Sequence, residues 1–361
     1  MRSSEPLSSK LSSDQPLPRE VDCVIVGGGA AGLSAAINMG RMRRGVLLVD
    51  ERDRFLWHHV AYNVLGFPDG VPATEIRRLG WRHAARYGAR LLIGHVTTAA
   101  RVGDRFRLEI DRLPEGGMLA HIPGMNLPRD AEMATLFDEV PEGGPIEVVA
   151  RTVILATGVS GHFPDFPGRN ECIGRSLFWC LHCEGYESID RVVAVVGHDD
   201  SAVQTALDLL VFTDRVTLVA GRTEGFGVSE SRLADLAERG IGAHPFGVAE
   251  YENNDGQILA LVLDDPSRTR IPVEQVYTIR PTKATGNLAR QLGLELTAGG
   301  QIVVTPEQHT NVAGVYAAGD ATSLHDHQLS AAMHEGNQAA GGANYHLYDQ
   351  AQRADGEGRD C

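Results

Sequence analysis

Short apolar runs that end in glycine recur along this chain and predict its architecture. The first region consists of an apolar run at 22–26, a glycine-rich hexad at 27–32, apolar positions at helical spacing over 33–39, a second apolar run at 46–49 and the acids Asp50 and Glu51. This order of strand, Gly-x-Gly-x-x-Gly, helix, strand and acid is typical of a dinucleotide-binding βαβ unit.

There is a physical reason why a dinucleotide-binding turn needs glycine at several positions of this hexad. Its glycines allow a tight turn and let a pyrophosphate approach the N-terminus of the following helix, while Asp50 can accept hydrogen bonds from ribose hydroxyls. The residues that we expect to contact a dinucleotide are Gly27, Gly29, Ala30, Ala31, Gly32, Asp50 and Glu51.

The same pattern returns in the second half of the chain. An apolar run at 192–196 leads into Gly197, and a further apolar run follows at 216–219. The number of residues between Gly27 and Gly197 also separates the apolar run 46–49 from the run 216–219, so the two regions align without a gap. Two such units in one chain predict an α/β fold with two Rossmann-like dinucleotide-binding domains, each of three layers, ββα.

Two more apolar runs that end in a glycine turn predict strands that complete the first domain, so the chain is expected to leave that domain and return to it. These runs lie at 153–158 and 314–320. The predicted parts are a Ser- and Pro-rich disordered tail at 1–20, a discontinuous first domain at 21–168 and 292–361, and a second domain at 169–291 inserted into the first. The Pro- and Gly-rich stretch 114–145 is predicted to be an inserted surface loop.

Composition narrows the classes of function. The hydrophobic fraction of 43% and the charged fraction of 22% are those of a soluble globular protein. The net charge of −14 argues against a nucleic-acid partner, whose phosphates would repel it. The uncharged run 23–40 is as long as a membrane span, but its glycines favour the strand, turn and helix already described. No membrane association is therefore expected, and without an apolar signal segment the predicted location is the cytoplasm.

Two of the five cysteines, Cys180 and Cys183, stand three residues apart. The spacing alone permits a zinc site, a structural clip or a redox couple. Zinc needs four ligands, and Cys23 in a predicted strand, the lone Cys172 and Cys361 at the end of a polar tail make no second pair, so no metal site is predicted. A lasting disulfide is unusual in the cytoplasm, whereas a Cys-x-x-Cys thiol acidified at a helix N-terminus is a nucleophile.

Four motifs, taken in order, resemble those of the low-molecular-weight thioredoxin reductases. They are the hexad 27–32, the strand end 156–158, the cysteine segment 180–186 and the run 314–320, which resembles the family's flavin-ribityl motif. The resemblance covers most of the chain from 21 to 347 and implies FAD in the first domain and a homodimer. The FAD contacts that it adds are Asn63, Ala156, Thr157, Gly158, Gly319, Asp320, His327 and Gln328.

The resemblance also implies catalytic roles at the cysteine motif. Cys183 is expected to face the flavin and Cys180 to exchange with the substrate. Glu184 is expected to protonate or deprotonate the departing thiol, its structural alternative being a solvated carboxylate that begins a helix.

Several histidines are candidates for proton chemistry, because imidazole titrates near neutral pH. His327 stands where the family has an arginine beside the flavin, and it is either a base for a substrate thiol or a polar group beside the cofactor. His334 has the same two interpretations. His58 and His59 are predicted to be loop residues rather than groups at the flavin face.

The second βαβ unit departs from an NADPH-binding one. Asp199 replaces the middle glycine and brings a Cβ and a negative charge to the phosphate position, which costs on the order of 1–4 kcal/mol at intermediate dielectric. Only Arg222 remains of the basic cluster that the family uses for the 2′-phosphate, and Ala220 stands where the first unit has Asp50. We therefore expect poor use of NADPH.

The favoured hypothesis is an enzyme, an FAD-dependent thiol/disulfide oxidoreductase that oxidises a dithiol through Cys180 and Cys183 with O₂ or another acceptor. The segment 180–187 resembles the motif of the family's dithiol oxidases. The alternatives are an NADPH-dependent thioredoxin reductase, a disulfide reductase linked to ferredoxin or to a second flavin, and a non-catalytic flavin or redox sensor. The expected partner is a small-molecule dithiol or a thioredoxin-like protein.

Overall fold

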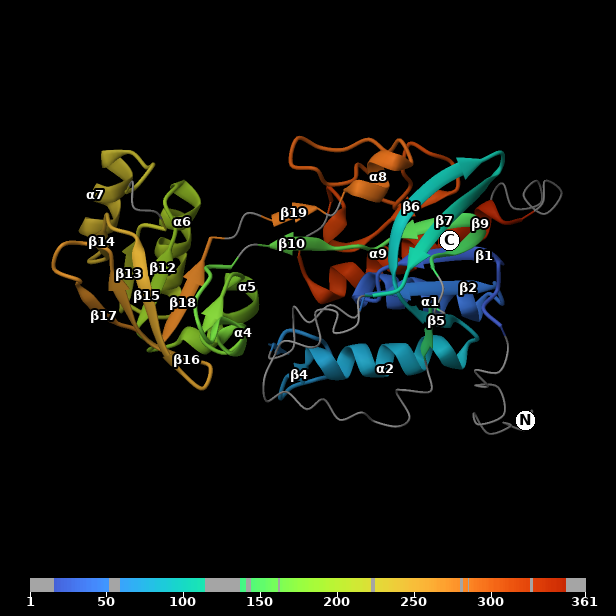
Figure 1. The fold of residues 1–361 in the computed structure, drawn as a ribbon. Coiled ribbons are helices and arrows are strands. Elements are labelled where there is room, and N and C mark those ends of the chain that lie inside the picture. The colour runs from blue at the N-terminus through green and yellow to red at the C-terminus, as the bar shows by residue number, and fades with distance from the viewer. Residues whose placement is uncertain are drawn as a thin grey trace. The chain divides into compact units, whose positions relative to one another are not determined.

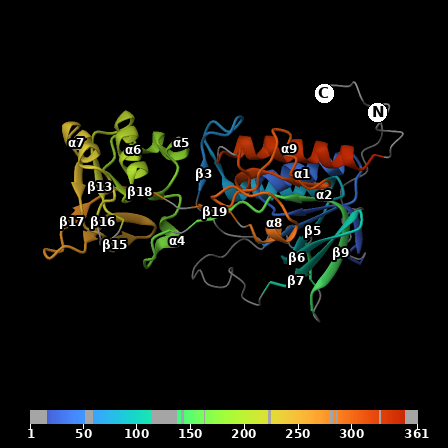
Figure 2. The same cartoon turned by 90° about the horizontal axis from the view of Figure 1, so that it is seen from above.

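The computed structural model describes residues 16–51, 59–113, 137–140, 144–161, 163–221, 225–279, 282–284, 286–324 and 327–348. Outside these ranges lie residues 1–15 of the predicted tail, most of the predicted insertion, and His58, Arg222 and Cys361. The chain divides into two compact units (Figure 1, Figure 2). Unit 1 comprises Met1–Phe55, Thr74–Ser160 and Lys283–Cys361, and unit 2 comprises Leu56–Ala73 and Gly161–Thr282.

Unit 1 is built on an eight-stranded sheet in the order β6-β7-β9-β1-β2-β5-β8, with β20 paired to β9. Its strands are β1 (Glu20–Val26), β2 (Val46–Asp50), β5 (Arg90–Ile93), β6 (His95–Val102), β7 (Arg105–Asp111), β8 (Phe137–Glu139), β9 (Ile146–Leu155) and β20 (Val315–Ala317). Its helices are α1 (Ala30–Arg41), α2 (Ala73–Arg86), α8 (Asn287–Gln291), the 3₁₀ turn η5 (Gly319–Ala321) and α9 (Leu329–His346). Two short strands, β10 (Val159–Gly161) and β19 (Thr282–Ala284), pair separately.

The predicted first strand becomes the centre of this sheet. β1 pairs in parallel with β2 on one side and β9 on the other, and Cys23 to Ile25 are wholly buried. A strand covered on both faces needs a continuous apolar run, which is what the sequence supplies. α1 and α9 pack on one face, and a Cβ at Gly336 of α9 would lie 2.1 Å from the backbone oxygen of Ala31. Small residues therefore let these two helices approach closely.

Part of the predicted surface loop at 114–145 is instead a strand of the sheet. β8 pairs in parallel with β5, and the ring of Phe137 packs edge-on against Trp81 with centroids 5.1 Å apart. Phe137 and Val140 are both buried. The Pro and Gly content around this short strand concealed its apolar positions, so the prediction of a surface loop is wrong for these residues.

Unit 2 combines a five-stranded parallel sheet in the order β11-β18-β12-β13-β14 with a three-stranded antiparallel sheet, β15-β16-β17. The strands are β11 (Leu177–Phe178), β12 (Val193–Val196), β13 (Val216–Val219), β14 (Gly242–His244), β15 (Val248–Asn254), β16 (Gln257–Leu263), β17 (Arg270–Pro272) and β18 (Gln275–Thr278). The helical elements are α4 (Arg169–Cys172), α5 (Leu181–Glu184), η3 (Tyr186–Ser188), α6 (Asp200–Asp208), η4 (Leu209–Val211) and α7 (Glu230–Glu238).

The layers of unit 2 follow from its two apolar cores. On one face of the parallel sheet, residues of α6 and α7 such as Val203 and Leu236 pack against β12 and β13. On the other face, Ile258 and Leu261 of β16 pack against the same sheet. Sheet, sheet and helices make the predicted three ββα layers, and the α/β fold class is confirmed.

The segment 56–73 groups with unit 2, although the sequence analysis placed it inside the first domain. Its described part contains the short antiparallel strands β3 (Val60–Ala61) and β4 (Val71–Pro72), with Ala61 paired to Val71. Within the ranges that the structure describes, no helix has the length and apolar character needed to cross a membrane.

Candidate redox and dinucleotide sites

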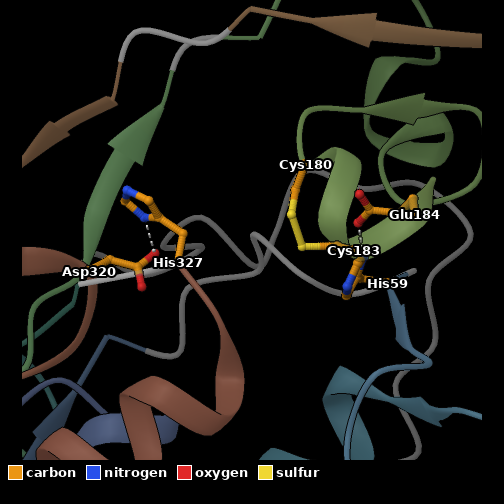
Figure 3. The surroundings of a disulfide bond; sticks show 6 residues. All are labelled: His59, Cys180, Cys183, Glu184, Asp320 and His327. Carbon is orange, nitrogen blue, oxygen red and sulfur yellow. Dashed lines mark ion pairs between the residues drawn. A yellow bond between two sulfur atoms is a disulfide. The ribbon is translucent and has the colours of Figure 1, made fainter. Parts of the chain in front are cut away.

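The two cysteines of the Cys-x-x-Cys segment are joined in a disulfide, with Cα atoms 5.2 Å apart (Figure 3). Cys180 precedes the one-turn helix α5, and its carbonyl oxygen accepts hydrogen bonds from the backbone N–H groups of Cys183 and Glu184, both at 3.1 Å. The turn brings the two sulfur atoms together because residues three apart lie on the same side of a helix. Both cysteines are half-buried.

Glu184 is buried rather than solvated, with 4% of its surface exposed. Burial, and secondarily the charge of Glu187, raise the pKa of its carboxyl group from 4.5 to about 8. A carboxyl group with this pKa is protonated at neutral pH and can donate a proton. The interpretation of Glu184 as a surface carboxylate that merely begins a helix does not fit this environment.

His59 lies against this carboxyl group, with Nδ1 3.2 Å from Oε1 of Glu184 (Figure 3). Burial lowers the pKa of the imidazole, so a neutral His59 faces a protonated Glu184. The ring of His59 also approaches that of Trp179, with centroids 6.0 Å apart. The prediction that His59 is only a loop residue missed this contact, because nothing in the local sequence links a histidine to an acid so far along the chain.

A buried hydrogen-bond network supports the residues that follow Glu184. Oγ of Ser188 donates to Oε1 of Gln275 at 2.6 Å and lies 2.9 Å from the hydroxyl oxygen of Tyr277. Burial raises the pKa of Tyr277, and the nearby Glu184 and Glu187 add to this effect. The base of the disulfide helix is thereby fixed to strand β18.

The glycine turn before α1 has the form that a dinucleotide requires. Gly27 has φ +107°, and a Cβ there would lie 2.2 Å from the carbonyl oxygen of Ala156. A Cβ at Gly32 would lie 1.9 Å from the oxygen of Gly27, whereas a Cβ at Gly29 would meet nothing within 4 Å. Gly29 begins the helix without a side-chain cap, and its first turn contains no acid. Ala30 and Ala31, also predicted contacts, lie in that first turn.

At the end of β2, Asp50 is buried and accepts a hydrogen bond from Nη2 of Arg77 at 2.9 Å. A Cβ at Gly28 would meet the Asp50 carboxylate, which shows how closely the turn approaches this acid. Glu51 contacts the imidazole of His95 at 2.5 Å. Both acids are predicted from the sequence, but Arg77, which lies on α2 beyond the βαβ unit, is not.

The second half of the predicted flavin site is gathered around the N-terminus of α9. Nδ1 of His327 lies 3.5 Å from Oδ2 of Asp320, and Figure 3 shows the two side chains facing each other. The backbone N–H of Gly319 donates to Oε2 of Glu335 at 2.6 Å, and Gln328 occupies the N-cap position of α9. His327 adopts φ +55°, a left-handed conformation that fixes the direction of its side chain.

Residues of the strand end after β9 complete this half of unit 1. β9 pairs in parallel with both β1 and β20, so Ala156, Thr157 and Gly158 follow a strand that lies beside the ends of both. Gly158 has φ +64°. Asn63, the remaining predicted flavin contact, belongs to unit 2, where it lines a cavity together with Cys183.

The glycine turn before α6 is built differently from the turn before α1. Asp199 caps α6 with its own carboxylate, which accepts hydrogen bonds from the hydroxyl of Ser201 at 2.5 Å and the backbone N–H of Ala202 at 3.3 Å. Partial burial alone would raise the pKa of Asp199, but these bonds and the nearby His198 outweigh it, so the pKa lies below its usual value. The N-terminus of α6 therefore holds an anion that belongs to the chain.

Backbone contacts also bring the segment after β13 against this turn. The N–H of Gly227 donates to the carbonyl oxygen of His198 at 2.6 Å, and that of Gly221 donates to Gly197 at 3.3 Å. Ala220, at the position that corresponds to Asp50, is fully buried and has no polar side-chain atom for a ribose.

Cys180, Cys183 and Glu184 also bring three potential metal ligands within 4.8 Å of one another. A structural zinc site takes four ligands, and cysteine binds metal as a thiolate rather than as a disulfide. Cys23 and Cys172 are buried elsewhere, and burial raises the pKa of both thiols, to about 12 and about 11. The trio is therefore better suited to redox chemistry than to metal binding.

Comparisons with known proteins extend these observations. A family model described as pyridine nucleotide-disulphide oxidoreductase matches residues 21–358. The chain is 29% identical over 316 residues to "Thioredoxin reductase tcpT" of Claviceps purpurea (strain 20.1), which covers 83% of this chain and 86% of that protein. It is 28% identical over 342 residues to an alkyl hydroperoxide reductase protein of Pseudomonas putida; this match covers 90% of the chain but 58% of that relative.

Two solved structures have nearly the same extent as this chain. The crystal structure of HlmI has a TM-score of 0.75 at 25% identity and covers 95% of this chain and 98% of its own. The putative thioredoxin reductase TrxB from Bacillus anthracis has a TM-score of 0.74, covers 93% of this chain and 99% of its own, and at 21% identity bears on the fold alone. The chain belongs to the pyridine nucleotide-disulphide oxidoreductase family, as a thioredoxin reductase-like flavin oxidoreductase that acts on sulfur groups.

Proposed function

We propose that this protein is an FAD-dependent oxidase of dithiols, in which the Cys180–Cys183 disulfide accepts two electrons from the substrate. The observation that carries the proposal is the contrast between the two glycine turns of one chain. The N-terminus of α1 has no side-chain cap, whereas that of α6 is occupied by the carboxylate of Asp199. One turn favours a bound pyrophosphate, and the other repels it.

The residues of unit 1 fit FAD. The N-terminus of a helix attracts the negative charge of a pyrophosphate, and Gly29 leaves open space for its close approach. Asp50 supplies carboxylate oxygens for ribose hydroxyls, and Asp320 with His327 and Gln328 forms the proposed flavin-side contacts. FAD, when bound, supplies a two-electron relay from the reduced cysteine pair to an acceptor such as O₂.

NADPH use is proposed to be poor because two described positions of unit 2, Asp199 and Ala220, offer this nucleotide no attractive contact. A carboxylate at Asp199 repels a pyrophosphate by on the order of 1–4 kcal/mol at intermediate dielectric. The bonds from Ser201 and Ala202 hold that charge at the helix terminus. Ala220 adds no ribose partner, so nothing at these positions offsets the repulsion.

The cysteine pair and Glu184 can oxidise a dithiol by thiol–disulfide exchange. A substrate thiolate attacks one sulfur, a mixed disulfide forms, and the other cysteine sulfur leaves as a thiolate that takes a proton from Glu184. The second substrate thiol, after losing its proton to water, then breaks the mixed disulfide, and the cysteine sulfur released in this step takes a proton from water. The substrate becomes a disulfide, and Cys180 and Cys183 become two thiols, so two electrons have moved.

A second candidate function is NADPH-dependent reduction of a thioredoxin-like protein. It is supported by the name of the Claviceps purpurea relative, a thioredoxin reductase, which aligns over most of both chains. Under this function electrons flow from unit 2 toward a protein disulfide rather than from a dithiol. A homodimer and a cytoplasmic location stay predictions under either function.

Anaerobic reduction of the bound flavin separates the two functions. We expect dithiothreitol to bleach the visible flavin absorbance much faster than NADPH does, and we expect Cys180→Ser to abolish bleaching by dithiothreitol while FAD is retained. With O₂ present, wild-type protein should form hydrogen peroxide as the dithiol is oxidised. Rapid bleaching by micromolar NADPH would instead identify a pyridine-nucleotide-dependent reductase.

A further inference from the structure

A cavity of about 940 Å³ lies within unit 2 and reaches the disulfide helix at Cys183. Its walls come from three places in the chain: the segment that contains Tyr62 and Asn63, the residues of α5 and η3, and the end of α6 with η4. Cavities of roughly 300–1,000 Å³ are typical sites for small molecules rather than for protein surfaces. Its position beside the disulfide makes it a candidate substrate site.

The walls of this cavity are largely apolar and aromatic. Tyr186 is 74% exposed, Val211 81% and Tyr62 49%, and the apolar lining also includes Pro68, Leu181 and Phe212. Large side chains with this much exposure can bury further apolar surface when a ligand covers them. The ligand therefore has an apolar body.

The charged groups at the cavity are mostly acidic. Glu187 and Asp208 both line it, and His182 is the only basic residue among the lining residues that the structure describes. One carboxylate oxygen of Glu187, Oε2, is buried and has no hydrogen-bond partner within the described part of the chain. Carboxylates and aromatic rings together attract an organic cation, the first by charge and the second through the ring face.

We propose that this cavity selects amphipathic small-molecule dithiols that carry a positively charged amine, with Glu187 and Asp208 as specificity-determining residues. The inference rests on the proposed dithiol oxidation. The amine binds between the two carboxylates, and the apolar body contacts Tyr62 and Tyr186. The dithiol then attacks Cys183, which lines the cavity, rather than Cys180, which the family resemblance makes the exchanging cysteine. Two thiols of the ligand lose two electrons and two protons, one disulfide forms in the ligand, and the enzyme disulfide opens to two thiols, with O₂ as the final oxidant.

The test compares two dithiols that differ mainly in charge: dithiothreitol, which is neutral, and dithiobutylamine, its amine analogue. The second-order rate constant for anaerobic flavin bleaching is measured with each. The informative quantity is the rate constant for dithiobutylamine divided by that for dithiothreitol. Because the amine also changes the intrinsic reactivity of the thiols, this ratio is compared between the wild type and each variant. We expect Glu187→Gln and Asp208→Asn each to lower the ratio several-fold, and added salt to lower it in the wild type.

The control is Glu230→Gln, an exposed carboxylate of α7 outside the cavity. It should leave the ratio unchanged. If Glu187→Gln fails to fold, Asp208→Asn carries the test, since this side chain lies at the end of α6 and accepts only an exposed hydrogen bond from Gln204 among its described contacts.

Each outcome separates this inference from the proposed function. If neither dithiol bleaches the flavin, dithiol oxidation itself is wrong. If both do, with the same ratio in wild type and variants, the oxidation stands and the selectivity for cations is wrong. If reduced thioredoxin bleaches the flavin far faster than either small dithiol, the substrate is a protein and the cavity is not its site.

Discussion

At the scale of single residues, the disulfide lies near two ionisable side chains, Glu184 and His59, that are both in their neutral forms. Glu184 and His59 are both buried, and burial moves the pKa of each toward its neutral form. A neutral acid beside a neutral imidazole avoids the cost of a buried ion pair and keeps a proton available near the sulfur atoms. In the proposed function, this proton goes to the thiolate that leaves when the disulfide opens.

Replacement of Glu184 by Gln should flatten the pH dependence of stability. Because the pKa of Glu184 is raised on folding, the native state binds the proton more tightly than the unfolded state between pH 4.5 and about 8. Its contribution is complete below pH 4.5 and is lost as the pH rises through 8, an effect on the order of 5 kcal/mol. Urea unfolding of wild type and Glu184→Gln across this range measures the difference.

Two observations would contradict this assignment. One is a wild-type stability curve that parallels that of Glu184→Gln between pH 5 and pH 9. The other is an unchanged curve in Glu184→Gln combined with a changed one in Glu187→Gln, since Glu187 is the charged neighbour that contributes to the shift.

At the scale of elements, the two βαβ units show how one residue alters the use of a helix terminus. In α1 the cap position is Gly29 and the first turn is open. In α6 the cap position is Asp199, and the side chain satisfies the N–H of Ala202. A carboxylate stabilises an isolated helix end by the same forces that attract a phosphate, so the chain's own anion replaces an external one.

Asp199→Gly should therefore improve the response to NADPH. Replacement of the cap by glycine costs only a few tenths of a kcal/mol of stability, while removal of the charge lowers the NADPH concentration needed for half-maximal flavin reduction by about tenfold. The gain is limited because Ala220 still offers no ribose contact. The measurement is the anaerobic bleaching rate against NADPH concentration.

Asp200→Asn is the matched control, since it removes a charge from the same turn but leaves the cap in place. An equal improvement in this variant would mean that general charge, rather than the capped position, governs NADPH use.

Gly29→Ala should separate folding of unit 1 from FAD binding. A methyl group at this position meets nothing within 4 Å of the described chain, so the melting temperature of the FAD-free protein should hardly change. It does fill the space through which a pyrophosphate approaches, so the purified protein should contain much less FAD. The ratio of flavin absorbance to protein after purification is the readout.

Gly341→Ala in α9 provides the comparison, because a Cβ there also meets nothing within 4 Å and lies on a helix. This variant should retain its FAD. Full FAD content in Gly29→Ala would show that the turn before α1 is not the pyrophosphate site.

The sequence predicted these elements well where a local pattern reflects local structure. The apolar runs became β1, β2, β12 and β13, because a strand buried on both faces has no polar positions to mask it. Asp199 was recognised as a departure from the hexad, but its cap geometry was visible only in the structure. Arg77 and His59 were not identified as site residues, since their contacts with Asp50 and Glu184 join distant segments that no periodicity connects.

At the scale of the whole molecule, the residues of the proposed reaction are distributed over two units, each of which has its own core. Unit 1 contains the turn before α1 and the Asp320–His327 pair, and unit 2 contains the disulfide and the turn before α6. The family match extends across both, over residues 21–358. The insertion of one unit into the other is predicted by the apolar runs at 153–158 and 314–320, which stand on either side of the second βαβ unit and complete the first domain.

The segment 56–73 belongs to unit 2 in space but to unit 1 in chain order. His59, which contacts Glu184, is therefore encoded apart from the cysteines that it accompanies. An exchange of modules between related genes that moved only residues 161–282 would transfer the disulfide without its imidazole neighbour. Recombination can thus reshape the redox centre of such proteins without altering either cysteine.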